Sequence, residues 1–130
     1  MLNFQLNQDK SILINKNPTV FVVDDDPMIR DALALLINQE GNHVSAFSNG
    51  SDFLASCSKD EIGCVIIDLN MPGMSGIELQ TKMLEAGIFL PIIFLTGFGD
   101  IPTSVKAIKA GATNFLTKPV DSSFLKNLRN

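Results

Sequence analysis

Five polar side chains stand where apolar runs of this sequence end: Asp24, Asp25, Asp68, Thr96 and Lys118. If those runs are parallel strands of one sheet, their carboxyl ends meet at one edge and these side chains share a crevice. Three carboxylates in one crevice repel one another and raise each other's pKa values unless a cation is present. A hard divalent ion such as Mg²⁺, which prefers oxygen ligands, would resolve that conflict.

A lysine and a threonine near the three acids complete a set suited to phosphoryl transfer. Lys118 adds a positive charge and the Thr96 hydroxyl adds a hydrogen bond, so catalysis would rest on positioning and charge neutralisation. The only histidine is His43, and the sequence indicates no Ser–His or Cys–His pair as a nucleophile. A carboxylate is therefore the expected nucleophile, and an aspartyl phosphate is the expected intermediate.

Short β-branched and aromatic runs predict the strands that deliver these side chains. They cover residues 19–23, 44–47, 64–67, 91–95 and 113–116. Five helices are expected. The first begins at Pro27 and is terminated by Gly41, the second opens near residue 48, and the third carries the apolar residues of 77–84 and ends at Gly87. The fourth covers about residues 102–110, and the fifth begins at residue 121. Asp26 is expected to be the N-cap of the first helix, with Pro27 at its first position and Gly41 at its end.

Strands that alternate with helices predict an α/β fold, with a doubly wound five-stranded parallel sheet. Right-handed crossovers and the small size favour the flavodoxin-like order 2-1-3-4-5. Residues 1–17 are polar and are expected to be a flexible leader, whereas residues 18–130 form one domain. The last helix has no C-cap before residue 130, so we interpret it as truncated from a longer protein.

The composition argues against several classes of function. The net charge of −4 argues against nucleic-acid binding by this segment, because phosphate contacts need clustered Lys and Arg. No apolar run approaches the roughly 20 residues that span a bilayer, and the N-terminus lacks the order of a signal peptide, so we expect a cytoplasmic location. Cys57 and Cys64 have neither metal-ligand spacing nor a disulfide framework.

Four motifs of this chain resemble the receiver domains of two-component response regulators, which are CheY-like in fold. They are Asp24-Asp25-Asp26 after Val22-Val23, the stretch 67–76, Leu95-Thr96-Gly97 and Lys118-Pro119. The resemblance spans residues 18–129 in the family's order and spacing. The segment Thr-Gly-Phe-Gly-Asp-Ile-Pro at 96–102 is similar to the FixJ-type subset, whose members usually carry a C-terminal helix-turn-helix of the LuxR type.

The resemblance implies a phosphoacceptor and a metal site. Asp68 matches the phosphoacceptor, which is also a metal ligand, and Asp25 matches the acid that ligates the ion directly. Asp24 matches the neighbouring acid, which acts on the ion through water. Asn70 matches the position whose backbone carbonyl ligates the ion. The implied ion is Mg²⁺, with Mn²⁺ as a substitute.

The resemblance also implies a switch. Thr96 matches the hydroxyl that swings toward the phosphoryl oxygens, and Lys118 matches the lysine that pairs with the acids and then with the phosphoryl group. Phe115 matches the aromatic residue whose rotamer follows Thr96. It is Phe, not Tyr, so it has no phenolic hydrogen bond to report the active state. Phe98 occupies a position that tunes dephosphorylation in the family.

A signalling domain, rather than an enzyme acting on a separate substrate, is the implied activity. It would take its phosphoryl group from a sensor histidine kinase and catalyse its own dephosphorylation. A DNA-binding output domain beyond residue 130 is the expected target, with a free-standing receiver as the alternative. A phosphorylation-dependent homodimer is expected through the face of the fourth helix, fifth strand and fifth helix, with exposed candidates Val105, Lys106, Ile108 and Lys109.

Three other functions fit the residues less well. A flavodoxin-type electron carrier needs a Ser/Thr/Gly-rich phosphate loop after the first strand, where this chain has aspartates that would repel a flavin phosphate. A haloacid-dehalogenase-type phosphatase expects an Asp-x-Asp pair after the first strand. Here Asp68-Leu69-Asn70 follows the third strand and lacks the second acid. A receiver that serves only for protein interaction would have lost Asp68, Lys118 or the acid pair.

Overall fold

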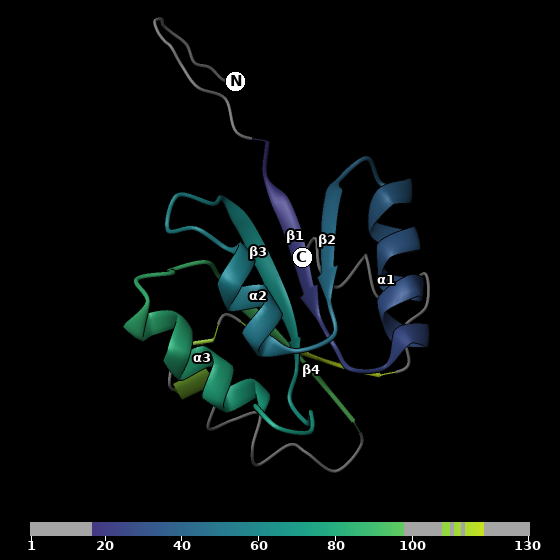
Figure 1. Cartoon of the computed structure of the whole chain (residues 1–130). Coiled ribbons are helices and arrows are strands. Elements are labelled where there is room, and N and C mark those ends of the chain that lie inside the picture. The colour runs from purple at the N-terminus through teal and green to yellow at the C-terminus, as the bar shows by residue number, and fades with distance from the viewer. Residues whose placement is uncertain (1–16, 98–107, 110, 113, 119–130) are drawn as a thin grey trace, which may run out of the picture.

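The computed structural model describes residues 17–97, 108–109, 111–112 and 114–118. Within them, five parallel strands form one sheet in the order β2-β1-β3-β4-β5 (Figure 1). The strands are β1 (Thr19–Val23), β2 (His43–Phe47), β3 (Gly63–Asp68), β4 (Ile92–Thr96) and β5 (Asn114–Thr117). The predicted α/β class and the order 2-1-3-4-5 are confirmed.

Helices cover both faces of the sheet. Figure 1 shows α1 (Pro27–Gln39) on one side and α2 (Gly50–Ser56) with α3 (Gly76–Glu85) on the other. Two buried clusters match these layers. The cluster beneath α1 consists of Val22, Leu33, Ile37, Ile66 and Leu95. The cluster on the other face includes Val23, Phe53, Ile67, Leu79, Met83 and Phe94. None of the helices in the described ranges is long and apolar enough to cross a membrane.

Successive residues of β1 serve the two clusters in turn, so the strand is buried on both faces. Val22 lies in the cluster beneath α1 and Val23 in the opposite one, and both are fully buried. Apolar runs therefore predict these strands correctly, because a parallel sheet between two helix layers has no face that needs polar residues.

The first helix begins and ends as its sequence predicts. The Asp26 side chain accepts a hydrogen bond from the Met28 N–H at 2.9 Å, which identifies it as the N-cap. Pro27 is the first helical residue, where its missing N–H is not needed. The helix ends at Gln39, and Gly41 follows with φ of +84°, a left-handed conformation that glycine adopts without strain.

Two predicted strands are displaced by one residue. Strand β4 begins at Ile92 rather than Pro91 and includes Thr96. Pro91 has no N–H to donate, although its carbonyl accepts from the Val65 N–H at 3.0 Å. Strand β5 covers 114–117 rather than 113–116, and residue 113 lies outside the described residues. Of the predicted leader, only residue 17 lies within the described residues. Of the helix predicted over 102–110, only residues 108 and 109 do, and the helix predicted from 121 lies outside them.

Candidate functional site

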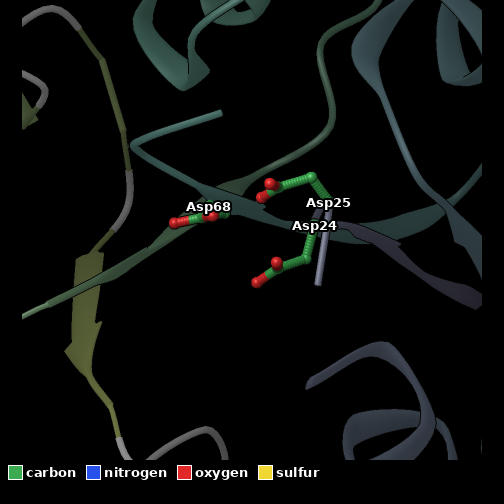
Figure 2. A group of neighbouring side chains, drawn as sticks. All are labelled: Asp24, Asp25 and Asp68. Atoms are coloured by element: carbon green, nitrogen blue, oxygen red, sulfur yellow. The ribbon is translucent and has the colours of Figure 1, made fainter. Parts of the chain in front are cut away.

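Three carboxylates gather at the carboxyl edge of the two central strands. Asp24 and Asp25 follow β1, and Asp68 is the last residue of β3. One ligand oxygen from each lies within 4.8 Å of the others, and Figure 2 shows the three side chains reaching toward the same side. The cluster predicted from the strand ends is present, within the part of the chain that the structure describes.

Parallel pairing explains why the acids meet. Val23 is paired with Ile67 in the register of β1 and β3, so the residues that follow, Asp24 and Asp68, emerge side by side. The Asp24 N–H donates to the Phe47 carbonyl at 3.1 Å, and this bond continues the pairing with β2 beyond the end of β1. Asp24 and Asp68 are consequently buried, at 1 and 4% exposure, whereas Asp25 is exposed.

Lys118 lies opposite the two buried acids. Its Nζ is 3.6 Å from Asp68 Oδ1 and 3.7 Å from Asp24 Oδ2. The backbone fixes its place, since the Lys118 N–H donates to the Thr96 carbonyl at 2.9 Å and thereby extends the pairing of β5 with β4. One lysine thus stands between two carboxylates, and a third carboxylate lies beside them.

Burial leaves the acids short of stabilising partners. Desolvation, followed by the charge of Asp24, raises the pKa of Asp68 from its ordinary value of 3.8 to about 6. Desolvation also raises the pKa of Asp24, although the Asp26 N–H and Lys118 oppose the rise. Within the described residues, the buried Asp24 Oδ2 has no hydrogen-bond partner. A buried acceptor without a donor is costly, so this oxygen suits a further cationic group or its water.

The loop after β3 holds Asp68 against the first turn of α3. The Asn70 N–H donates to Asp68 Oδ1 at 3.3 Å. The Gly76 N–H donates to the Leu69 carbonyl at 3.0 Å. A Cβ on Gly76 would lie 2.6 Å from the Asp68 carbonyl oxygen, so this close approach requires glycine.

A capping box that was not predicted from the sequence starts α3. The Glu78 N–H donates to Ser75 Oγ at 3.2 Å, and the Ser75 N–H donates to Glu78 Oε1 at 3.0 Å. The Ser-x-x-Glu spacing before an apolar stripe is the signal that would have identified it. The box fixes the end of the loop that carries Asn70.

Thr96 and Phe115, the predicted switch residues, lie on β4 and β5, and Thr96 is the last residue of β4. Thr96 is fully buried, and its hydroxyl donates to the Gly97 carbonyl at 3.2 Å. Phe115 is half-buried and packs against the core cluster on the side of α2 and α3. Phe98 and Pro119 lie outside the described residues.

Arg30 is a further residue at the site that was not predicted from the sequence. Its Nη1 donates to the Asp24 carbonyl at 2.8 Å from the first turns of α1. A side chain six residues along the chain that bonds to a backbone carbonyl leaves no periodic signal in the sequence. The contact depends on the angle at which α1 leaves the strand.

Comparisons with known proteins agree with this geometry. The family model of the response regulator receiver domain matches residues 20–129. The chain is 45% identical over 105 residues to the response regulator protein TmoT of Ectopseudomonas mendocina, covering 81% of this chain and 48% of TmoT. It is 40% identical over 106 residues to the transcriptional regulatory protein FixJ of Bradyrhizobium diazoefficiens, covering 82% of this chain and 52% of FixJ.

Solved structures show the same likeness. The crystal structure of FixJ-N superposes with a TM-score of 0.78 at 35% identity, covering 87% of this chain and 90% of that one. The response regulator StyR gives a TM-score of 0.79 at 45% identity, covering 86% of this chain and 57% of that one. The chain spans about half the length of the curated relatives it matches.

Proposed function

Because the chain belongs to the response regulator receiver domain family, we propose that it is a phosphorylation switch in which Asp68 is the phosphoacceptor. The carrying observation is the placement of Lys118 Nζ within 3.7 Å of both Asp24 and Asp68, beside a cluster of three carboxylates. A buried nucleophile with one cation and two further acids suits phosphoryl transfer, in which charge neutralisation dominates.

The residues present fit a divalent ion. Their ligand atoms are hard carboxylate oxygens, and within the described residues the buried Asp24 Oδ2 accepts no hydrogen bond. Asp25, Asp68 and the Asn70 carbonyl would hold the ion directly, with Asp24 acting through water. Mg²⁺ is the natural candidate, and Mn²⁺ would substitute. When bound, the ion neutralises negative charge on the phosphoryl oxygens.

The chain's own residues account for the transfer step. An Asp68 carboxylate oxygen forms the new O–P bond while the P–N bond to the kinase histidine breaks, and the imidazole leaves with the electron pair and takes a proton. Lys118, already beside Asp68, pairs with the phosphoryl oxygens as they arrive. Hydrolysis of the same acyl phosphate by water would return Asp68 and inorganic phosphate, so the domain would limit its own active lifetime.

A change at Thr96 would carry the signal away from Asp68. Its hydroxyl donates to the Gly97 carbonyl in the present state and can instead donate to a phosphoryl oxygen after rotation. The half-buried Phe115 would follow into the vacated space. Phosphorylation would then shift a two-state equilibrium on the surface that includes β5.

The partners of the whole protein follow from the family. Response regulators receive their phosphoryl groups from histidine kinases, and many carry DNA-binding output domains. We expect both here, in the cytoplasm, with no nucleic acid bound by this acidic segment. Of the predicted dimer face, Lys109 is exposed as predicted, whereas Ile108 is half-buried because it packs against the core cluster. Val105 and Lys106 lie outside the described residues.

Phosphorylation with acetyl phosphate tests the proposal. Intact mass after incubation with Mg²⁺ should show one added phosphoryl group, lost with a chelator and in Asp68→Asn. Asp31→Asn, which removes an exposed acid of α1 that is not part of the cluster, is the matched control and should gain the group normally. Absence of any mass gain in the natural chain, or an equal gain in Asp68→Asn, would refute Asp68 as the acceptor.

A further inference from the structure

Arg30 is bonded to the backbone of the acidic cluster from the first turns of α1. Its Nη1 donates to the Asp24 carbonyl at 2.8 Å, a short bond in a partly buried setting. Its own N–H donates to the Asp26 carbonyl at 3.0 Å, which is the first hydrogen bond of the helix. Arg30 therefore ties the strand-to-helix turn to α1 at two carbonyls.

The carbonyl that Arg30 holds belongs to the peptide that joins Asp24 to Asp25. Asp24 itself is fixed from several sides, because its N–H donates to Phe47 and its Oδ1 accepts from the Asp26 N–H at 2.9 Å. Asp25 has no such support. Its side chain is exposed, and among the described residues no hydrogen bond or ion pair holds its carboxylate. Rotation of the joining peptide would swing Asp25 relative to Asp24.

Arg30 acts on the cluster through this peptide and not through its charge. Lys118 Nζ lies 3.7 Å from Asp24 Oδ2 and 3.6 Å from Asp68 Oδ1, so it is the cation directed at the carboxylates. Arg30 Nη1 instead bonds to the backbone carbonyl of Asp24. Its effect on the site should consequently be one of geometry.

We propose that Arg30 is a positioning residue, which holds the Asp24–Asp25 peptide so that the Asp25 carboxylate faces Asp68 and binds Mg²⁺. This inference rests on the proposed function. Groups that orient metal ligands typically contribute 10- to 100-fold to metal affinity. Loss of the guanidinium should weaken Mg²⁺ binding and leave the reactivity of Asp68 at saturating Mg²⁺ close to that of the natural chain.

Mg²⁺ affinity of three variants tests the inference. Arg30→Met keeps the apolar stem and removes the donor, whereas Arg30→Lys restores a charged donor. Lys82→Met removes an exposed positive charge from α3 and is the matched control. The chain has no Trp or Tyr, so binding is followed by titration calorimetry without a phosphoryl donor. The acetyl phosphate reaction is then measured across a range of Mg²⁺ concentrations.

We expect about 10-fold weaker Mg²⁺ binding in Arg30→Met, most of it recovered in Arg30→Lys, and no change in Lys82→Met. The maximal phosphorylation rate should be kept. Natural Mg²⁺ affinity in Arg30→Met would overturn the inference. If the maximal phosphorylation rate were lost as well, the guanidinium would act on the phosphoryl group itself.

Two further results separate folding and the proposed function from the inference. If Arg30→Met does not fold, Arg30→Gln replaces it as the variant whose shorter side chain withdraws the donor, and the same two outcomes decide. If the natural chain and Lys82→Met bind no Mg²⁺, the proposed function fails with the inference. If both bind it and the Arg30 variants match them, the inference alone fails.

Discussion

Replacing Asp68 with asparagine should stabilise the metal-free domain, and the gain should depend on pH. The pKa of Asp68 rises from 3.8 to about 6 on folding. Each pKa unit corresponds to about 1.4 kcal/mol, so ionising Asp68 in the folded chain costs about 3 kcal/mol relative to the unfolded chain. Asparagine keeps the shape and removes this cost.

The sign follows from proton binding. Between pH 3.8 and about 6 the folded chain holds more protons on Asp68 than the unfolded chain does. The contribution of Asp68 to stability is therefore fully present below pH 3.8 and is lost as the pH rises through about 6. The advantage of Asp68→Asn should accordingly grow across this window and level off near pH 7. The raised pKa of Asp24 acts in the same direction.

Urea unfolding followed by far-ultraviolet circular dichroism measures the effect. With a denaturant dependence of about 2 kcal/mol per molar, 3 kcal/mol moves the midpoint by about 1.5 M at pH 7.5. Mg²⁺ at 100 times its dissociation constant should add about 2.7 kcal/mol to the natural chain and much less to Asp68→Asn. A variant that is less stable than the natural chain at pH 7.5 without Mg²⁺, or an advantage unchanged from pH 4 to 7.5, would refute the reasoning.

Four other substitutions, one of them a control, test how the site is held. Gly76→Ala should lose about 2 kcal/mol in urea unfolding, because its Cβ would meet the Asp68 carbonyl oxygen at 2.6 Å. Gly41→Ala, which meets nothing within 4 Å, should lose only the smaller conformational cost, and equal losses would contradict the steric explanation. Ser75→Ala should lose about 1 kcal/mol with its capping box, and an unchanged unfolding midpoint would count against it. Lys118→Met should raise the pKa of Asp68 further in a carboxyl carbon NMR titration, because Lys118 lowers it in the natural chain, and an unshifted titration would contradict this role of the ion pair.

The sequence predicts most of the fold because burial on both faces leaves a simple pattern. Val22 and Val23 serve opposite helix layers, so the strand is apolar throughout and its polar end is easily located. The meeting of Asp24 with Asp68 then follows from parallel pairing alone. The start of β4 was displaced by one residue because Pro91 pairs only in part. Its carbonyl accepts from the Val65 N–H, but it has no N–H of its own to donate.

Contacts that depend on helix placement could not be predicted in this way. Arg30 reaches the Asp24 carbonyl only because α1 leaves the strand at a particular angle, and that angle is set by packing of Leu33 and Ile37 beneath the helix. Among the described residues, Asp24 Oδ2 has an ion pair with Lys118 but accepts no hydrogen bond, which is likewise a consequence of three-dimensional crowding. The sequence identifies the acidic residues of the cluster, but it does not show which carboxylate oxygen accepts no hydrogen bond.

The three acids of the cluster differ in burial and in how their positions are fixed. Asp24 and Asp68 obtain fixed positions from the sheet, at the cost of the desolvation that raises their pKa values. Asp25 is exposed, so it stays hydrated and open to an arriving ion, but no strand pairing holds it. A site built this way needs an additional support for its exposed ligand, and the bond from Arg30 to the joining peptide supplies one. The repulsion that destabilises the metal-free cluster would then favour Mg²⁺ binding, because a bound ion would relieve it.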